Sequence, residues 1–158
     1  MEKEENKYPP RARLDDGTEV RLVPLERTGK PLYVSRDGRA FSYVQEHFRL
    51  IKPFPTAYPR NKYNGGRKQQ YLKMHHRHHH ILIHRAVLLA WVGPCPEGYE
   101  ADHLNGITTD NRIENLEWVT PAENVRRAVE MRRRKRLTEQ GKAALQARQG
   151  LLIHVKNV

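Results

Sequence analysis

The sequence predicts an α+β protein with an N-terminal antiparallel β-sheet, a central strand, loop, strand and helix core, and a basic helical C-terminal region. Three observations support this prediction. Short runs rich in β-branched and aromatic residues, separated by turn residues, occupy residues 19–83. A strong helix-start signal follows two short strands near residue 120. Arginine and lysine dominate the next turns of that helix.

The N-terminal sheet is predicted from three short strands. They are expected at Val20–Pro24, Leu32–Val34 and Ala40–Tyr43. Asp37-Gly38 supplies a hairpin turn between the last two, because glycine adopts the positive φ that such turns require. Residues 1–18 are charged and rich in turn residues, so we expect a frayed segment there.

An apolar helix is predicted to start at His84-Arg85 and to end at Gly93-Pro94. We expect His84 to cap the helix or to pack at its start, with phosphate contact as the alternative. The lone Cys95 follows in the next loop. One cysteine excludes an internal disulfide and any paired-cysteine zinc site.

The central core begins with an acid and a histidine at the end of a short strand. Asp102 and His103 close the run Tyr99–Leu104, and Asn105-Gly106 then supplies a turn. After a polar loop, Leu116–Val119 reads as a second strand. Adjacent residues on an ideal strand point to opposite faces, so Asp102 and His103 need a local twist to reach one phosphate.

The next helix has a complete start signal. Thr120-Pro121-Ala122-Glu123 provides the N-cap hydroxyl, the N1 proline and the N3 glutamate of a capping box, so the helix should begin at Pro121. Asn124 then lies in its first turn. We expect Thr138 to cap a second short helix, Glu139–Gln149, which Gly150 ends.

The charge of the first of these helices is unusual. Seven basic residues in eleven positions, opposed only by Glu130, wrap most of the helix and repel one another, and a polyanion would relieve this repulsion. They are Arg126, Arg127, Arg132, Arg133, Arg134, Lys135 and Arg136.

Composition agrees with a polyanion partner but does not decide the function. The chain has 158 residues and a formal net charge of +11, and basic residues that contact phosphates release counterions. The same charge fits a ribosomal, RNA-binding or anionic-membrane protein. No run of eighteen apolar residues and no signal or transit peptide is recognised, so we expect a soluble, cytoplasmic protein.

The region from His84 to Asn124 resembles the ββα-metal unit of HNH endonucleases, in particular the phage and intron-encoded group. The matching residues are Asp102-His103, Asn105-Gly106, Asp110-Asn111-Arg112, Glu114-Asn115-Leu116, Trp118-Val119-Thr120 and Glu123-Asn124. A weaker resemblance extends to about residue 31. It implies a β-rich module that helps to grip DNA. Together with the residue patterns above, we expect four parts: a flexible segment at 1–18, a β-rich DNA-binding module at 19–83, a nuclease core at 84–136, and a C-terminal helix and tail at 137–158.

The resemblance also implies residue roles. Asp102 and Asn124 would bind one divalent cation, His103 would be the general base, and Asn115 would brace the loop. Asn124 stands where other HNH enzymes have a metal-binding histidine. Carboxylate and amide oxygens are hard ligands, which favour Mg²⁺ or Mn²⁺ over Zn²⁺.

The implied activity is hydrolysis of phosphodiester bonds in double-stranded DNA. A monomer with one site would nick one strand, whereas a dimer or two sequential events could break both. We expect basic residues to contact DNA, namely Arg85, Arg126, Arg127, Arg132, Arg133, Arg134 and Arg136. The first alternative is a non-catalytic DNA-binding protein that retains the HNH scaffold.

The second alternative is a histidine-rich metal-binding protein. In the run His75–His80, His76, His78 and His80 share one face if residues 71–83 form one strand, and could chelate a transition metal. No cysteine or acid supplements them, and the flanking basic residues repel a cation. We therefore favour a polar strand or hairpin that faces DNA.

Overall fold

The computed structural model describes residues 8–25, 31–56, 70–76 and 79–155. The chain divides into two compact units, Met1–Val119 and Thr120–Val158. Among these described residues, the first unit contains three antiparallel sheets, one α-helix and a short 3₁₀ helix, and the second unit contains one long α-helix. These elements confirm the predicted α+β class.

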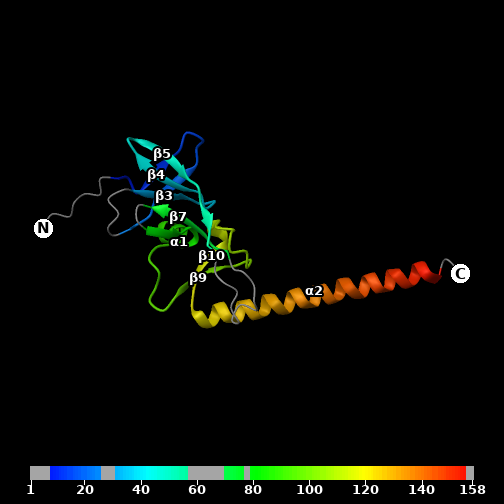
Figure 1. Cartoon of the computed structure of the whole chain (residues 1–158). Coiled ribbons are helices and arrows are strands. Elements are labelled where there is room, and N and C mark those ends of the chain that lie inside the picture. Colours follow the sequence, from blue (N-terminus) through cyan, green and yellow to red (C-terminus); the bar gives the residue numbers. More distant parts are fainter. Residues whose placement is uncertain (1–7, 26–30, 57–69, 77–78, 156–158) are drawn as a thin grey trace. The chain divides into compact units, whose positions relative to one another are not determined.

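The first sheet is a five-stranded antiparallel meander in the order β1-β2-β3-β4-β5. Figure 1 labels β3, β4 and β5 of this sheet. Its strands are β1 (Arg11–Arg13), β2 (Glu19–Leu22), β3 (Leu32–Ser35), β4 (Ala40–Val44) and β5 (His47–Ile51). The predicted Asp37-Gly38 turn joins β3 to β4, with Gly38 at φ +84° and its N–H donating to the Ser35 carbonyl over 3.1 Å. The expectation of a frayed segment over 1–18 was wrong for Arg11–Arg13, since β1 pairs with β2 there.

The described histidines of the run lie in a second sheet, which has three strands among the described residues. They are β6 (Phe54–Pro55), β7 (Leu72–His76) and β8 (His79–Leu82). His75 pairs with His80, and His76 pairs with His79. Positions 76 and 80 therefore fall on opposite faces of a hairpin. The metal-binding alternative required one strand over 71–83, and the structure has two paired strands instead. A hairpin was one of the two favoured forms, and its contact with DNA stays a prediction; His78 lies outside the described residues.

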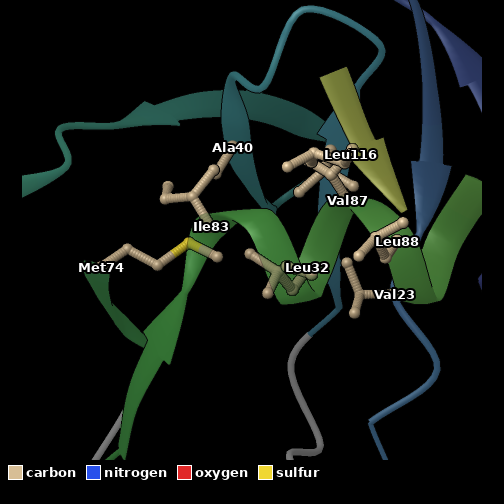
Figure 2. Close-up of a cluster of buried hydrophobic side chains, with 10 residues drawn as sticks. Val23, Leu32, Ala40, Met74, Ile83, Val87, Leu88 and Leu116 are labelled. Atoms are coloured by element: carbon tan, nitrogen blue, oxygen red, sulfur yellow. The ribbon is translucent and has the colours of Figure 1, made fainter. Parts of the chain in front are cut away.

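One hydrophobic core joins these sheets to helix α1 (Ile83–Trp91) and to strand β10 (Leu116–Val119). Figure 2 shows the side chains that meet there, from β3 and β4, from β7, from α1 and from β10. Its labelled members are Val23, Leu32, Ala40, Met74, Ile83, Val87, Leu88 and Leu116. Burying a valine, leucine, isoleucine or methionine side chain stabilises a fold by about 1.5–3 kcal/mol. Within the first unit, the N-terminal sheet is thus packed together with α1 and β10.

The third sheet is the predicted strand pair of the core. β9 (Glu100–His103) pairs antiparallel with β10, from Glu100 opposite Val119 to His103 opposite Leu116. The Asn105-Gly106 turn follows β9, with Gly106 at φ +70° and its N–H donating to the His103 carbonyl over 2.8 Å. A short 3₁₀ helix, Ile113–Asn115, leads into β10.

The second unit is helix α2 (Pro121–Val155), which begins at the predicted residue. The Glu123 N–H donates to the Thr120 hydroxyl over 3.3 Å, as a capping box requires. The predicted break at Thr138 was wrong. The Thr138 hydroxyl donates to the Arg134 carbonyl over 3.0 Å, one helical turn back, so it does not cap a new helix. Neither helix among the described residues is long and apolar enough to cross a membrane.

Candidate active site

The β9–β10 ribbon determines which way the acid and the histidine of the site face. Asp102 pairs with Glu117 and His103 pairs with Leu116, position by position. Neighbouring residues on such a ladder alternate between faces, so His103 lies on the core side with Leu116, and Asp102 lies on the other side with Glu117. This pairing alone gives no reason for both side chains to reach one phosphate.

His103 is enclosed by other rings. It is 4% exposed, and its ring centroid lies 5.0 Å from that of His84 and 6.0 Å from that of Tyr71. Its Nε2 lies 3.3 Å from Oδ1 of Asn111. Burial lowers the pKa of His103, although Asn111, Asp102 and Asp110 oppose this shift. The imidazole is therefore neutral at pH 7 and can accept a proton.

His84 packs against His103 from the first turn of α1. It is also 4% exposed, with its ring edge-on to that of His103 and 5.2 Å from Tyr71. Burial, together with the nearby His103 and Arg85, lowers the pKa of His84 to about 3. The predicted packing at the helix start is confirmed, whereas phosphate contact by His84 stays a prediction.

Asn115 holds the loop between the two strands at both ends. Its Oδ1 accepts the Asn105 N–H over 2.9 Å, and its Nδ2 donates to the Asp110 carbonyl over 2.8 Å. The side chain of Asn105 also donates to the Asp110 carboxylate over 2.9 Å. Arg112, with help from Asn105, lowers the pKa of Asp110. A buried amide with both of its polar atoms engaged fixes the path of this loop.

The second unit carries Asn124 in the first turn of α2, where the Asn124 N–H donates to the Thr120 carbonyl over 3.0 Å. Asp102 belongs to the first unit. Among the described residues, no group of three or more His, Cys, Asp or Glu side chains is arranged to hold a metal ion. Carboxylate and amide oxygens, the donors that these two side chains carry, are hard ligands of the kind that Mg²⁺ prefers.

The basic residues of α2 differ in their partners. Glu123 binds Arg126 and Arg127, each over 2.7 Å, and Glu130 binds Arg134. Arg126 and Arg127 lower the pKa of Glu123 to about 2. The interpretation that Glu130 alone opposes the basic run was incomplete, since Glu123 does so too.

A second group of basic residues has no such pairing. Within the described part of the chain, Arg132, Arg133 and Arg136 form no ion pair with a carboxylate, and all three are exposed. They are one, three and four residues apart, so at about 3.6 residues per turn they fall within about 100° of the helix surface. Arg85, on α1, is exposed as well.

Asn111 is a residue near His103 to which the sequence reasoning gave no role. It was recognised within the Asp-Asn-Arg segment of the loop, yet it supplies the hydrogen bond to His103. Tyr71 was likewise unassigned, although it flanks both histidines. Their positions depend on contacts between distant parts of the chain, which residue spacing does not reveal.

Comparisons with known proteins agree with the resemblance in the sequence. Residues 82–126 match the family model described as HNH endonuclease. The "Uncharacterized HNH endonuclease L247" of Acanthamoeba polyphaga mimivirus is 52% identical over 50 residues, covering 30% of this chain. The chain spans 13% of the length of that relative.

A solved structure described as "DNA binding and cleavage by the HNH homing endonuclease I-HmuI" is also similar. The match has a TM-score of 0.45 and 22% identity, and covers 63% of this chain and 52% of the other. Similarity at this level does not establish a shared activity.

Proposed function

We propose that this protein hydrolyses DNA phosphodiester bonds with a histidine general base and one divalent cation, because residues 82–126 match the family model described as HNH endonuclease. The observation that carries the proposal is the setting of His103. A buried, neutral imidazole lies at the end of β9 and forms a hydrogen bond with Asn111. The loop that follows is held by the two hydrogen bonds of the Asn115 side chain. This is a setting in which a base is oriented before substrate arrives.

His103 would accept a proton from the attacking water. The water oxygen forms a bond to phosphorus, the bond from phosphorus to the 3′-oxygen breaks, and solvent water protonates that oxygen. The products are a 5′-phosphate and a 3′-hydroxyl. Burial lowers the pKa of His103, so the neutral, proton-accepting form persists to a lower pH than for a free histidine. One positioned base contributes roughly 10²–10⁴-fold to the rate.

Asp102 and Asn124 are the proposed ligands of the cation, and their oxygens suit Mg²⁺ or Mn²⁺. When bound, such an ion polarises the phosphoryl oxygen and offsets charge on the leaving oxygen. Glu117 is paired with Asp102 across the ribbon. The negative potential of this second carboxylate favours a cation near Asp102.

Double-stranded DNA is the proposed partner, and the charge of α2 supports this. Arg132, Arg133 and Arg136 present three guanidinium groups on one face, with no carboxylate bound to them among the described residues. Arginine binds phosphate through paired N–H donors. Arg126, Arg127 and Arg134 would have to exchange a glutamate partner for a phosphate.

The test is cleavage of supercoiled plasmid by the purified full-length chain with Mg²⁺, Mn²⁺ or EDTA. We expect nicked or linear product with either ion and none with EDTA. His103→Ala should abolish cutting, whereas His47→Ala, at an exposed position on β5, should cut like the wild type. Equal cutting by His103→Ala would overturn the mechanism.

Two further variants test the proposed cation ligands. Asp102→Asn and Asn124→Ala should each lower both cleavage and the binding of Mn²⁺ measured by calorimetry, because each removes or weakens one oxygen ligand. DNA binding without cleavage under every metal condition would instead support the non-catalytic DNA-binding alternative.

A further inference from the structure

The amide of Asn111 has a defined orientation, which decides where the proton of His103 resides. Its Nδ2 donates to the Thr109 carbonyl over 3.3 Å, so its Oδ1 is the atom turned toward the imidazole. A carbonyl oxygen only accepts hydrogen bonds. The Nε2 of His103, at 3.3 Å, must therefore be the donor.

A neutral imidazole carries one proton, so a proton on Nε2 leaves the lone pair on Nδ1. The position of the proton matters for a base, because only the unprotonated nitrogen can accept another proton. An amide that holds one tautomer thus selects the nitrogen that can react.

The N-terminal sheet fixes Asn111 from the other side. Gly38, in the β3–β4 turn, lies so close that a Cβ added there would be 2.8 Å from both Cβ and the carbonyl oxygen of Asn111. Contacts this short are essentially never seen for real side chains. Two residues on, the Ile113 N–H donates to the Arg36 carbonyl over 2.8 Å, from the same turn.

The same turn makes a second link to the next residue of the loop. Arg36 forms an ion pair with Glu114 over 2.8 Å. The turn at residues 36–38 therefore holds the chain at Asn111, at Ile113 and at Glu114. With 5% exposure, Asn111 has little room to rotate.

Building on the proposed function, we propose that Asn111 is a positioning residue that holds the proton of His103 on Nε2 and leaves Nδ1 as the proton acceptor. Gly38 makes this positioning possible, because a residue without a side chain lets the β3–β4 turn pack directly against Asn111. The sheet then supports the catalytic loop, in addition to any contact that it makes with DNA.

The first test reads the tautomer directly, in the full-length chain without metal or DNA. Long-range ¹H–¹⁵N correlation spectra distinguish protonated from unprotonated imidazole nitrogens, and comparison with His103→Ala assigns the signals among the nine histidines. We expect the His103 proton on Nε2 in the wild type. A wild-type proton on Nδ1 would overturn the inference.

Variants of Asn111 separate positioning from mere packing. Asn111→Leu has no acceptor for Nε2, so the two tautomers should become mixed. Asn111→Asp restores an acceptor and should return the proton to Nε2. In cleavage assays Asn111→Leu should lower kcat by about 10²–10⁴-fold, the contribution of a general base, with little change in KM. Unaltered His103 signals in Asn111→Leu would refute the role.

The contribution of Gly38 has a matched control in Gly17. The two glycines have similar backbone angles, φ +84° and φ +81°, but a Cβ at Gly17 would meet no atom within 4 Å. Replacing either by alanine therefore imposes similar backbone strain, while only Gly38→Ala displaces Asn111. We expect shifted His103 signals in Gly38→Ala and wild-type signals in Gly17→Ala; the same response in both would contradict the proposal.

These spectra do not depend on nuclease activity. A chain that cuts no DNA but has the Nε2 proton controlled by Asn111 would overturn the proposed function and leave the positioning of His103 intact. A chain that cuts DNA with the His103 proton on Nδ1 would support the proposed function and overturn the positioning role of Asn111.

Discussion

The buried His84 should make the stability of the first unit depend on pH. Its pKa falls from the ordinary 6.5 to about 3 in the fold. Between these values the unfolded chain binds a proton that the folded chain excludes, so stability is lost as pH falls below about 6.5. From pH 7 to pH 5 the loss from this group is about 2 kcal/mol, because a pKa unit corresponds to about 1.4 kcal/mol.

His84→Leu replaces the titrating imidazole with an apolar side chain of similar size. The variant should lose about 2 kcal/mol less than the wild type between pH 7 and pH 5. Any fixed packing cost of the substitution cancels in this comparison. The pKa of His103 is also lowered by burial, but its contribution is present in both proteins.

Urea unfolding followed by tryptophan fluorescence measures this loss. The chain has two tryptophans, Trp91 on α1 and Trp118 on β10, and both belong to the first unit. The signal thus reports on the unit that contains His84. Equal losses of unfolding free energy in wild type and variant would refute the assignment of a buried, neutral His84.

Two further predictions concern α2. Arg132→Gln with Arg136→Gln should weaken DNA binding and reduce the slope of log K against log salt by about 2, since each phosphate contact contributes about 0.9. The charge-matched pair Arg126→Gln with Arg134→Gln should change the slope less, because Glu123 and Glu130 hold those arginines; fluorescence anisotropy over a salt series measures both, and equal slopes would count against a special arginine face. Gly141→Ala should stabilise the helix by about 1 kcal/mol, because Gly141 lies inside α2 and a Cβ there meets no atom within 4 Å. Its thermal unfolding by far-ultraviolet circular dichroism should shift upward, and an unchanged transition would contradict the continuous helix.

Features set by short-range chemistry could be predicted from the sequence. The Asp37-Gly38 and Asn105-Gly106 turns need positive φ at glycine, and the structure has it at both. The Thr120 cap needs a hydroxyl three residues before an N–H, and this bond is also present. Such signals depend on neighbouring residues, so tertiary packing does not have to be known in advance.

The wrong predictions have physical reasons as well. A run of histidines has no polarity pattern that marks a turn, so one strand and a hairpin could not be separated. Thr138 has the chemistry of a cap, but in α2 it donates to a carbonyl of its own helix. Residue preference at one position is weak compared with the continuity of good helix formers on either side.

The surroundings of His103 illustrate a limit of another kind. The residues that carry its chemistry are close together in sequence, whereas the residues that hold it are not: Gly38 precedes Asn111 by most of the first unit, and His84 comes from α1. Their roles follow from a core shared by β3, α1 and β10. A short motif can therefore identify the reacting group, but the proton position on that group depends on a sheet outside the motif. Grafting residues 82–126 alone onto another scaffold would transfer His103 without the turn that fixes Asn111.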